Sequence, residues 1–274
     1  MIDASQIVDL HRYPIADLDA PACRALLDTC RRDLDEHSIC TLTGFIRPDA
    51  MPALVAEAQA LEPKCYRNDN LRTPYSWMCN EGFAPDHPRS QVFRNRSGLV
   101  LTDQFPGDGP IETVYRWSPL TDFVRELLGL ETLYRSACPH LSLNLGVEHE
   151  GDQFGWHFDT NDGVVSLLLQ EPDGGGHFEY APYIRAENDE NYAEIARLFA
   201  GEPRIARRTL MNAGTFVLFN GRRSCHRVTP VEATAKPRII ALLSYDKCPD
   251  MVFSEANVRD AMNPSSQTYF GQPA

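Results

Sequence analysis

The stretch GWHFDTNDGVVSLLLQ, residues 155–170, places a histidine and an aspartate on the two sides of one phenylalanine and then continues into an apolar run. Residues two apart on a β-strand point to the same face, so His157 and Asp159 can present an imidazole and a carboxylate to one ion while Phe158 points away. Such a pair on its own is more often a solvated strand end than a set of metal ligands. The stretch therefore predicts a strand end with half of a metal site.

Short apolar segments surround this stretch between about residues 138 and 250, separated by Gly, Asp, Asn and Pro residues. One helical segment, residues 188–202, interrupts them. About eight short strands with such turns are typical of a β-sandwich or barrel. We therefore predict an α+β fold that is mainly β, with helices packed on one side of a double-sheet core.

The first half of the chain mixes predicted helices with one irregular segment. The expected helices span 17–38, 47–64 and 118–131, and an expected strand spans 39–46. Asp19 is a candidate cap for the first helix and Ser118 for the third. Between the last two helices, residues 64–112 are rich in Arg, Asn, Pro and Gly without a clear period. Because long irregular segments in compact proteins are usually functional, we interpret this one as a possible lid.

Length and composition indicate one enzyme-sized domain. The chain has 274 residues, 43% of them hydrophobic, which is enough for a well-buried core. We expect a single domain over 1–274, in which 1–137 form a helical or mixed support with the possible lid. Residues 138–250 would form the β core.

The charge balance argues against polyanionic partners. Lys and Arg total 26 against 38 Asp and Glu, and the net charge of −12 opposes attraction to nucleic acid or to an anionic membrane. No apolar run approaches the roughly 20 residues of a membrane span, and no basic leader is visible. The eight cysteines form no CxxC pair, so we interpret them as reduced, mostly buried thiols. We expect a cytoplasmic protein that acts on a small molecule, with neither nucleic acid nor membrane as a partner.

A third candidate ligand, His226, lies in RRSCHRVTPV, on a predicted strand that an antiparallel core can place opposite the first. Two histidines and one carboxylate on one face of a metal, with the opposite positions open, form the arrangement of non-haem Fe(II) oxygenases. Arg238 begins the next predicted strand, and its planar guanidinium suits a bidentate grip on a dicarboxylate co-substrate. Arg227 is the alternative for that role. Each residue alone has a structural explanation, but their order within one β core favours a joint site.

These residues resemble the Fe(II)/2-oxoglutarate-dependent oxygenases of the double-stranded β-helix, or jelly-roll, fold. Residues 151–185 are similar to the subgroup of free amino acid halogenases and their hydroxylase relatives. The resemblance implies a cupin-like core with flanking N-terminal helices, and 2-oxoglutarate held through its distal carboxylate by Arg238. It also implies that His157, Asp159 and His226 hold iron. The motifs that carry it are WHFD (156–159), GGGHFEY (174–180), GTFVLFNGRRSCHRVTPV (214–231) and KPRIIALLSYD (236–246).

The implied cofactors are Fe(II), 2-oxoglutarate as co-substrate, and O2. Three protein ligands leave room for 2-oxoglutarate to chelate the metal and for O2 to bind. The implied reaction converts 2-oxoglutarate to succinate and CO2 and hydroxylates an unactivated C–H bond. Halogenases of the subgroup have a small residue at the position of Asp159, where halide binds. The aspartate of this chain therefore favours hydroxylation over halogenation.

Two other classes stay open. A redox-inactive cupin-like metalloenzyme could use the same three ligands to hold Zn²⁺ and activate water, although that chemistry does not require Arg238. A non-catalytic β-sandwich binding module would need no metal ligands. Iron-dependent formation of succinate would separate the oxygenase from the binding module.

The candidate substrate-binding residues are polar or aromatic side chains near the predicted ligands. Asn161 and Asp162 follow the HxD pair on a turn and could meet a substrate amine, or could simply form the turn. Glu179 could pair with a cationic group of a substrate or of the protein. With the resemblance, these groups predict a small amine-bearing substrate, most simply a free L-amino acid. The remaining candidates are His140, Asn144 and Trp156, of which Trp156 is also a core candidate.

Overall fold

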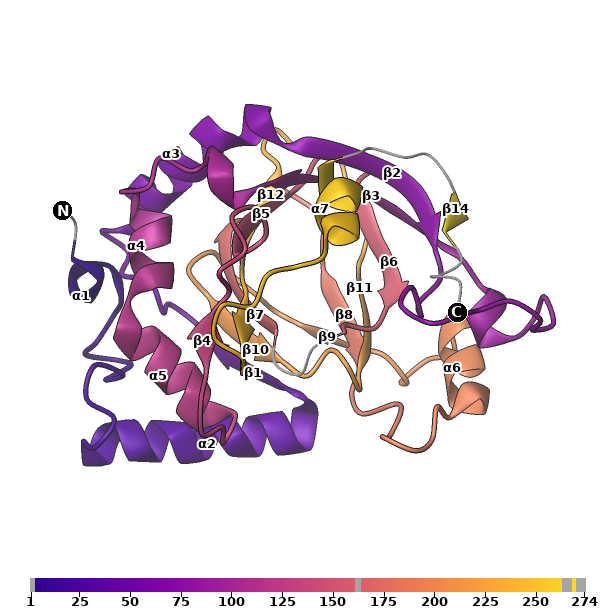
Figure 1. Cartoon of the computed structure of the whole chain (residues 1–274), viewed down its shortest axis with the longest axis horizontal. Helices are drawn as coiled ribbons and strands as arrows, with labels where there is room; N and C mark the ends of the chain where they lie inside the picture. The colour runs from indigo at the N-terminus through magenta and orange to yellow at the C-terminus, as the bar shows by residue number, and fades with distance from the viewer. Residues whose placement is uncertain (1–2, 161–163, 263–267, 270–274) are drawn as a thin grey trace.

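The computed structural model describes residues 3–160, 164–262 and 268–269, and one curled sheet of twelve strands lies at its centre (Figure 1). Its strand pairs are antiparallel except that of β14 (Thr268–Tyr269) with β2 (Tyr66–Arg72), which is parallel. β2 pairs with β3, and β4 (Tyr134–Arg135) with β13 (Tyr245–Asp246) forms a separate two-stranded sheet. In spatial order, the main path is β1 (Ile39–Leu42), β10 (Phe216–Phe219), β7 (Val164–Gln170), β12 (Arg238–Leu243), β5 (Leu143–Glu148), β3 (Phe93–Val100), β6 (Gln153–His157), β11 (Cys225–Val228), β8 (Phe178–Ala181) and β9 (Arg207–Thr209).

Strand β3 joins the two halves of the curled sheet. Its residues Gly98–Val100 pair with β5, whereas Asn95 and Arg96 pair with β6. One half therefore consists of β1, β10, β7, β12 and β5, and the other of β6, β11, β8 and β9. A cavity whose walls come from both halves lies between them.

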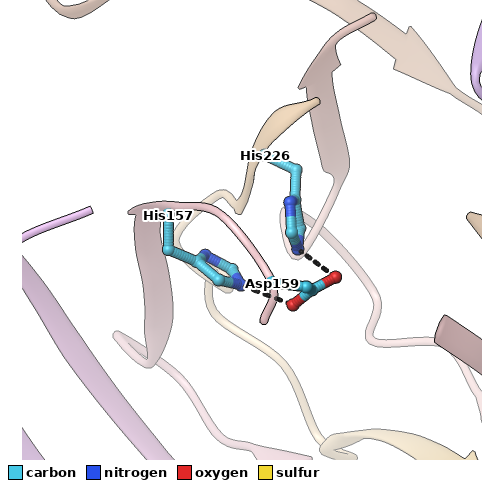
Figure 2. Close-up of side chains that lie close together, drawn as sticks. All are labelled: His157, Asp159 and His226. Carbon is cyan, nitrogen blue, oxygen red and sulfur yellow. Dashed lines mark ion pairs between the residues drawn. The ribbon is translucent and has the colours of Figure 1, made fainter. Parts of the chain in front are cut away.

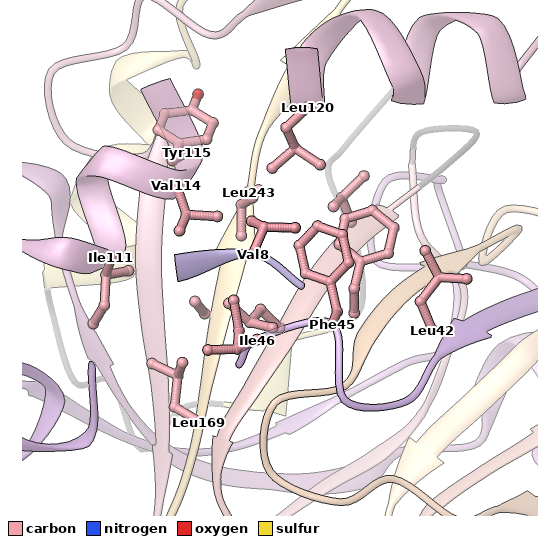
Figure 3. Close-up of a cluster of buried hydrophobic side chains, with 14 of the residues drawn as sticks. Val8, Leu42, Phe45, Ile46, Ile111, Val114, Tyr115, Leu120, Leu169 and Leu243 are labelled. Carbon is pink, nitrogen blue, oxygen red and sulfur yellow. The ribbon is translucent and has the colours of Figure 1, made fainter. Parts of the chain in front are cut away.

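Alternation along the strands decides which side chains reach that cavity. On β5, Leu143, Leu145 and Val147 are fully buried in the main hydrophobic core, which also takes alternate residues of β7 and β12 (Figure 3). The intervening residues Gly146 and Glu148 line the cavity instead. Each large aliphatic side chain in the core contributes roughly 1.5–3 kcal/mol through burial. The core thus fixes the register that aims the polar residues inward.

Helices from the first half of the chain cover the outer face of this core (Figure 1). α6 and α7 lie apart from this group, and 3₁₀ turns span Glu62–Lys64, Pro88–Ser90 and Thr102–Gln104. The mainly β architecture with flanking N-terminal helices is the one that the sequence predicts. The helices are α1 (Ala4–Ile7), α2 (Pro21–His37), α3 (Met51–Leu61), α4 (Pro110–Arg116), α5 (Ser118–Leu127), α6 (Tyr192–Phe199) and α7 (Glu255–Met262).

Both predicted helix caps are wrong. α2 begins at Pro21 with Ala20 as its N-cap, and Asp19 accepts a hydrogen bond from the side chain of Arg24 instead. α5 follows α4 directly through Trp117, so Ser118 is already the first helical residue. In each case a proline in the first turn presets the helical backbone angle without a side-chain cap.

The segment 64–112 contains two strands of the central sheet, so the prediction that it is irregular is wrong. β2 (YRNDNLR) and β3 (FRNRSGLV) contain residues of low strand propensity, which hides them from a sequence reading. Cross-strand charges support the pairing instead, since Arg94 contacts Asp69 at 2.7 Å. The buried carboxylate of Asp152 accepts from Arg67 at 2.6 Å. The sheet therefore extends beyond the region 138–250 that the sequence assigns to the core.

All eight cysteines are free thiols, and five of them are buried. This agrees with the prediction of reduced, mostly buried cysteines. Among the helices of the described ranges, none is long and apolar enough to cross a membrane.

Candidate metal centre

Strand pairing brings the two candidate histidines together. His157 is the last residue of β6, and His226 lies on β11 as its direct cross-strand partner. The centroids of the two rings are 3.9 Å apart. The antiparallel placement expected from the sequence is therefore present, and the two residues meet at one end of the cavity.

Backbone carbonyls fix which ring nitrogen of each histidine faces the centre. Nδ1 of His157 lies 2.8 Å from the carbonyl oxygen of Gly155, and Nδ1 of His226 lies 3.1 Å from that of Ser224. A carbonyl only accepts, so each Nδ1 carries the proton and each Nε2 keeps its lone pair. Such second contacts commonly orient metal-binding histidines. Both Nε2 atoms point at Asp159, as Figure 2 shows.

Asp159 completes a group of three ligand atoms. Its Oδ1 lies 3.8 Å from Nε2 of His157, and its Oδ2 lies 3.5 Å from Nε2 of His226. These distances are too long for hydrogen bonds, and Oδ2 is buried without a hydrogen-bond partner among the described residues. All three ligand atoms lie within 4.8 Å of one another. Three electron-pair donors that converge in this way suit a metal cation.

A glycine opposite Asp159 makes room for its carboxylate. The backbone N–H of Asp159 donates to the carbonyl oxygen of Gly221 at 3.0 Å. A Cβ atom on Gly221 would stand only 1.8 Å from Oδ2 of Asp159. Residue 221 must therefore be glycine for the carboxylate to occupy this position.

Burial shifts the pKa of each of the three side chains in the direction that favours its neutral form. Desolvation, with a smaller contribution from neighbouring His226, lowers the pKa of His157 to about 3. Desolvation also lowers the pKa of His226 to about 4 and raises the pKa of Asp159. The imidazoles are thus neutral near pH 7 and keep the lone pairs that a metal ion needs. The donor set fits Fe(II), which takes two imidazoles and one carboxylate.

The cavity next to the three ligands has a volume of about 250 Å³ and is mostly lined by apolar side chains. Its walls include Phe178, Phe219 and Leu242. Besides the three candidate ligands, the charged groups of its described lining are Arg238 and Glu148. Arg238 is buried at the start of β12, and its Nη1 donates to Oε2 of Glu148 at 2.9 Å. The cavity therefore extends from the three candidate ligands to a buried guanidinium.

Arg227, the alternative to Arg238, points away from this cavity. Its guanidinium pairs with Glu179 at 2.7 Å and lies 4.6 Å from the ring centroid of Trp156. Because neighbouring residues of a strand face opposite sides, His226 points inward and Arg227 outward.

The structure does not bring most of the candidate substrate residues to the cavity. Glu179 faces outward and is held by Arg227 and Arg208, because its neighbour Phe178 takes the inward position on β8. His140 pairs with Asp103 at 3.2 Å beside a separate cavity near α7. Asn161 and Asp162 lie outside the described residues.

The two other candidates are buried but do not line the cavity. Trp156 belongs to a hydrophobic cluster with Tyr75 and Phe158, so its interpretation as a core residue is the one the structure supports. Asn144 donates to the carbonyl oxygen of Leu141 at 3.2 Å, and its Oδ1 has no partner within the described ranges.

Sequence reasoning missed Glu148 and Gly221. Glu148 stands two residues after Gly146 at the end of an apolar strand, so alternation places it on the cavity face once the strand is assigned. Gly221 gives no such signal, because its importance depends on a tertiary contact with Asp159. Tyr75, also missed, packs against Phe158, the residue between His157 and Asp159, and the centroids of the two rings are 5.3 Å apart.

A sequence model of the halogenase D family matches residues 97–263, which is more than half of the chain. The chain belongs to the halogenase D family. The match covers all three candidate ligands and Arg238. No curated protein matches this family member in sequence.

Solved structures with low sequence identity share the fold of this halogenase D family member. The epimerase SnoN from nogalamycin biosynthesis, described as non-haem and α-ketoglutarate dependent, has a TM-score of 0.54 at 12% identity, over 82% of this chain and 84% of its own. AviO1 from Streptomyces viridochromogenes Tue57 has a TM-score of 0.53 at 14% identity, over 81% of this chain and 95% of its own. A 2OG-Fe(II) oxygenase family protein from Burkholderia pseudomallei has a TM-score of 0.50 at 14% identity, over 81% of this chain and 91% of its own. The family member therefore has the double-stranded β-helix fold of the 2-oxoglutarate and Fe(II) oxygenases.

Proposed function

We propose that this protein is an Fe(II)/2-oxoglutarate-dependent oxygenase that hydroxylates an unactivated C–H bond of a small amine-bearing molecule, most simply a free L-amino acid. The observation that carries the proposal is the convergence of two Nε2 lone pairs and one carboxylate within 4.8 Å. The three side chains are His157, Asp159 and His226. The fold and the family agree with this assignment.

The chain's own residues have defined roles in this proposal. His157, His226 and Asp159 would hold iron, and Arg238 would bind the distal carboxylate of 2-oxoglutarate. When bound, iron with 2-oxoglutarate and O2 supplies the oxidant that removes hydrogen from a C–H bond and returns a hydroxyl group. The apolar walls keep water away from the reacting atoms and hold the substrate in one orientation.

Arg238 is suited to a dicarboxylate by its donors and its burial. A guanidinium has five N–H donors, and in the described chain its side chain makes one hydrogen bond, to Glu148. The remaining donors are available to a carboxylate that enters the cavity. A Zn²⁺ enzyme that activates water needs no such group, so Arg238 supports the oxygenase over a redox-inactive cupin-like enzyme.

Halogenation is the second candidate, because the family that matches the chain is named for it. Asp159 argues for hydroxylation. Its carboxylate points at both histidines and takes a coordination position that a halide would otherwise need. Gly221 leaves the space that this carboxylate requires.

The size of the cavity supports a small substrate. About 250 Å³ must hold 2-oxoglutarate and the reacting part of the substrate, which suits a free amino acid better than a peptide. The amine preference rests on the family resemblance, since Glu179 faces away from the cavity.

A screen of free L-amino acids with Fe(II), 2-oxoglutarate and O2 tests the proposal. We expect iron-dependent succinate and a product heavier by one oxygen atom for at least one polar or cationic amino acid. A protein that hydroxylates only peptides or carrier-tethered groups would contradict the substrate class. A protein that forms no succinate under any of these conditions would contradict the reaction.

A further inference from the structure

Arg238 has a buried acidic partner inside the cavity, which neither the predicted site nor the proposed reaction uses. Arg238 and Glu148 are direct cross-strand partners on β12 and β5. Nη1 of Arg238 lies 2.9 Å from Oε2 of Glu148, and the two side chains are 4% and 6% exposed. Both residues line the same cavity as the three candidate ligands.

The space above Gly146 accommodates the Glu148 carboxylate. A Cβ atom on Gly146 would stand 3.3 Å from Oε1 of Glu148 and 3.1 Å from Cγ2 of Ile240. The carboxylate therefore folds back over Gly146, along the wall of the cavity. In this position it contacts one end of the guanidinium and leaves other N–H donors of Arg238 unused within the described chain.

The pair changes the charge that a dicarboxylate meets in the cavity. Arg238 and Glu148 together are neutral, so the distal carboxylate of 2-oxoglutarate adds a second negative charge beside the first. Repulsion between like charges is strong where the surroundings are apolar and exclude water. Glu148 therefore weakens the grip of Arg238 on any carboxylate, the substrate dianion and the product succinate alike.

We propose that Glu148 is a positioning residue that sets the affinity for 2-oxoglutarate and speeds the release of succinate. This inference rests on the proposed function, because it takes Arg238 as the binding group for the distal carboxylate. Glu148 compensates the buried guanidinium when no dicarboxylate is bound and holds its plane in place. When a dicarboxylate binds the remaining donors of Arg238, the negative charge of Glu148 repels it.

Titration of 2-oxoglutarate into Mn(II)-loaded protein without O2 tests this role by calorimetry. We expect Glu148→Gln to lower the Kd for 2-oxoglutarate by about tenfold, because the amide still accepts from Arg238 but no longer repels a carboxylate. Binding of 2-oxopentanoate, which lacks the distal carboxylate, should not change. Dissociation of succinate should become slower, and the melting temperature of the ligand-free variant should fall because the buried guanidinium loses the opposite charge beside it.

Glu112→Gln is the matched control. Glu112 is another buried glutamate paired with an arginine, Arg116, at 2.8 Å, but it lies on α4 outside the cavity. This variant should lower the melting temperature without changing the Kd for 2-oxoglutarate. Glu148→Ala also removes the charge and carries the same binding expectation if the Gln variant does not fold.

The outcomes separate this inference from the proposed function. If the wild type binds 2-oxoglutarate and both Glu148 variants bind it equally or more weakly, Glu148 has only a structural or orienting role and the inference is wrong. If neither the wild type nor the variants bind 2-oxoglutarate in the presence of Mn(II), the proposed function fails and the inference fails with it.

Discussion

The two ends of the cavity differ in how their charges are balanced. At the metal end, formed by His157, Asp159 and His226, two neutral imidazoles and a carboxyl group converge, and Oδ2 of Asp159 has no hydrogen-bond partner among the described residues. At the arginine end, formed by Arg238 and Glu148, a cation and an anion already balance each other. The metal end therefore suits a bound cation, whereas the arginine end already pairs a cation with an anion.

This difference predicts how each end responds to change. A ligand that binds only the folded state stabilises it, so metal should raise the melting temperature through the metal end. A dicarboxylate should do so less, because the charge of Glu148 at the arginine end repels it. The substitutions below test the two ends separately.

The largest effect is expected for His226→Ala. This variant loses a ligand from the metal end, so Mn(II) should no longer raise its melting temperature and succinate formation should fall to background. The chain should still fold, because His226 lines the cavity and is not part of the main hydrophobic core. Circular dichroism, a metal titration and a succinate assay would check these points.

His140→Ala provides the control for that experiment, since His140 pairs with Asp103 outside the cavity. It should bind Mn(II) and form succinate as the wild type does. Normal turnover in His226→Ala would reject His226 as a ligand.

At the arginine end, Arg238→Ala should weaken the use of 2-oxoglutarate. Loss of a buried charge-assisted contact costs about 2 to 5 kcal/mol, so the KM for 2-oxoglutarate should rise roughly 30-fold to a few thousandfold. Mn(II) binding should persist, because the three metal ligands are untouched. Arg227→Ala, on the outward face of β11, should leave this KM unchanged. An equal KM in wild type and Arg238→Ala would move the co-substrate site elsewhere.

A smaller effect is expected for Gly221→Ala. The added Cβ would stand 1.8 Å from Oδ2 of Asp159, so the carboxylate must shift while both histidines stay in place. Displacement of a reacting group by about 1 Å can cost about a hundredfold, and we expect kcat to fall by roughly tenfold to a hundredfold.

Gly109→Ala is the matched control for Gly221→Ala. A Cβ on Gly109 would also meet a carboxylate oxygen at 1.8 Å, that of Glu57, outside the cavity. Turnover should therefore stay near the wild-type rate in this variant. Equal activity of the two alanine variants would show that the Asp159 position is not critical.

The sequence predicts the parts of the molecule that follow from local pattern. Alternation and turn residues locate the strands between 138 and 250, and the HxD pair with His226 and Arg238 locates both ends of the cavity. β2 and β3 could not be found in this way, because their Arg, Asn and Asp residues are stabilised by cross-strand and long-range ion pairs such as Arg67 with Asp152. For Glu179 the sequence leaves a substrate cation and a protein cation open, and only the strand register, which turns the side chain outward to Arg208 and Arg227, decides for the protein.

The pairing of Glu148 with Arg238 can be predicted only in part from the sequence. The register of two strands far apart in the chain decides it, so neither segment alone reveals it. Once both strands are assigned, alternation places both side chains on the same face. The role of Gly221 cannot be predicted from sequence at all, since only the folded chain shows that a Cβ at this position would clash with the carboxylate of Asp159.

The most direct test of the account compares wild type with Asp159→Gly by product mass, with Fe(II), 2-oxoglutarate, O2 and excess chloride. We expect the wild type to add one oxygen atom and no chlorine, because Asp159 would fill the coordination position that a halide needs. We expect Asp159→Gly to keep His157 and His226, lose most hydroxylation and transfer chlorine only weakly, since one substitution does not rebuild the groups around the metal. A wild-type protein that chlorinates its substrate, or an Asp159→Gly variant that hydroxylates at the native rate, would contradict the assignment of Asp159 as the carboxylate ligand.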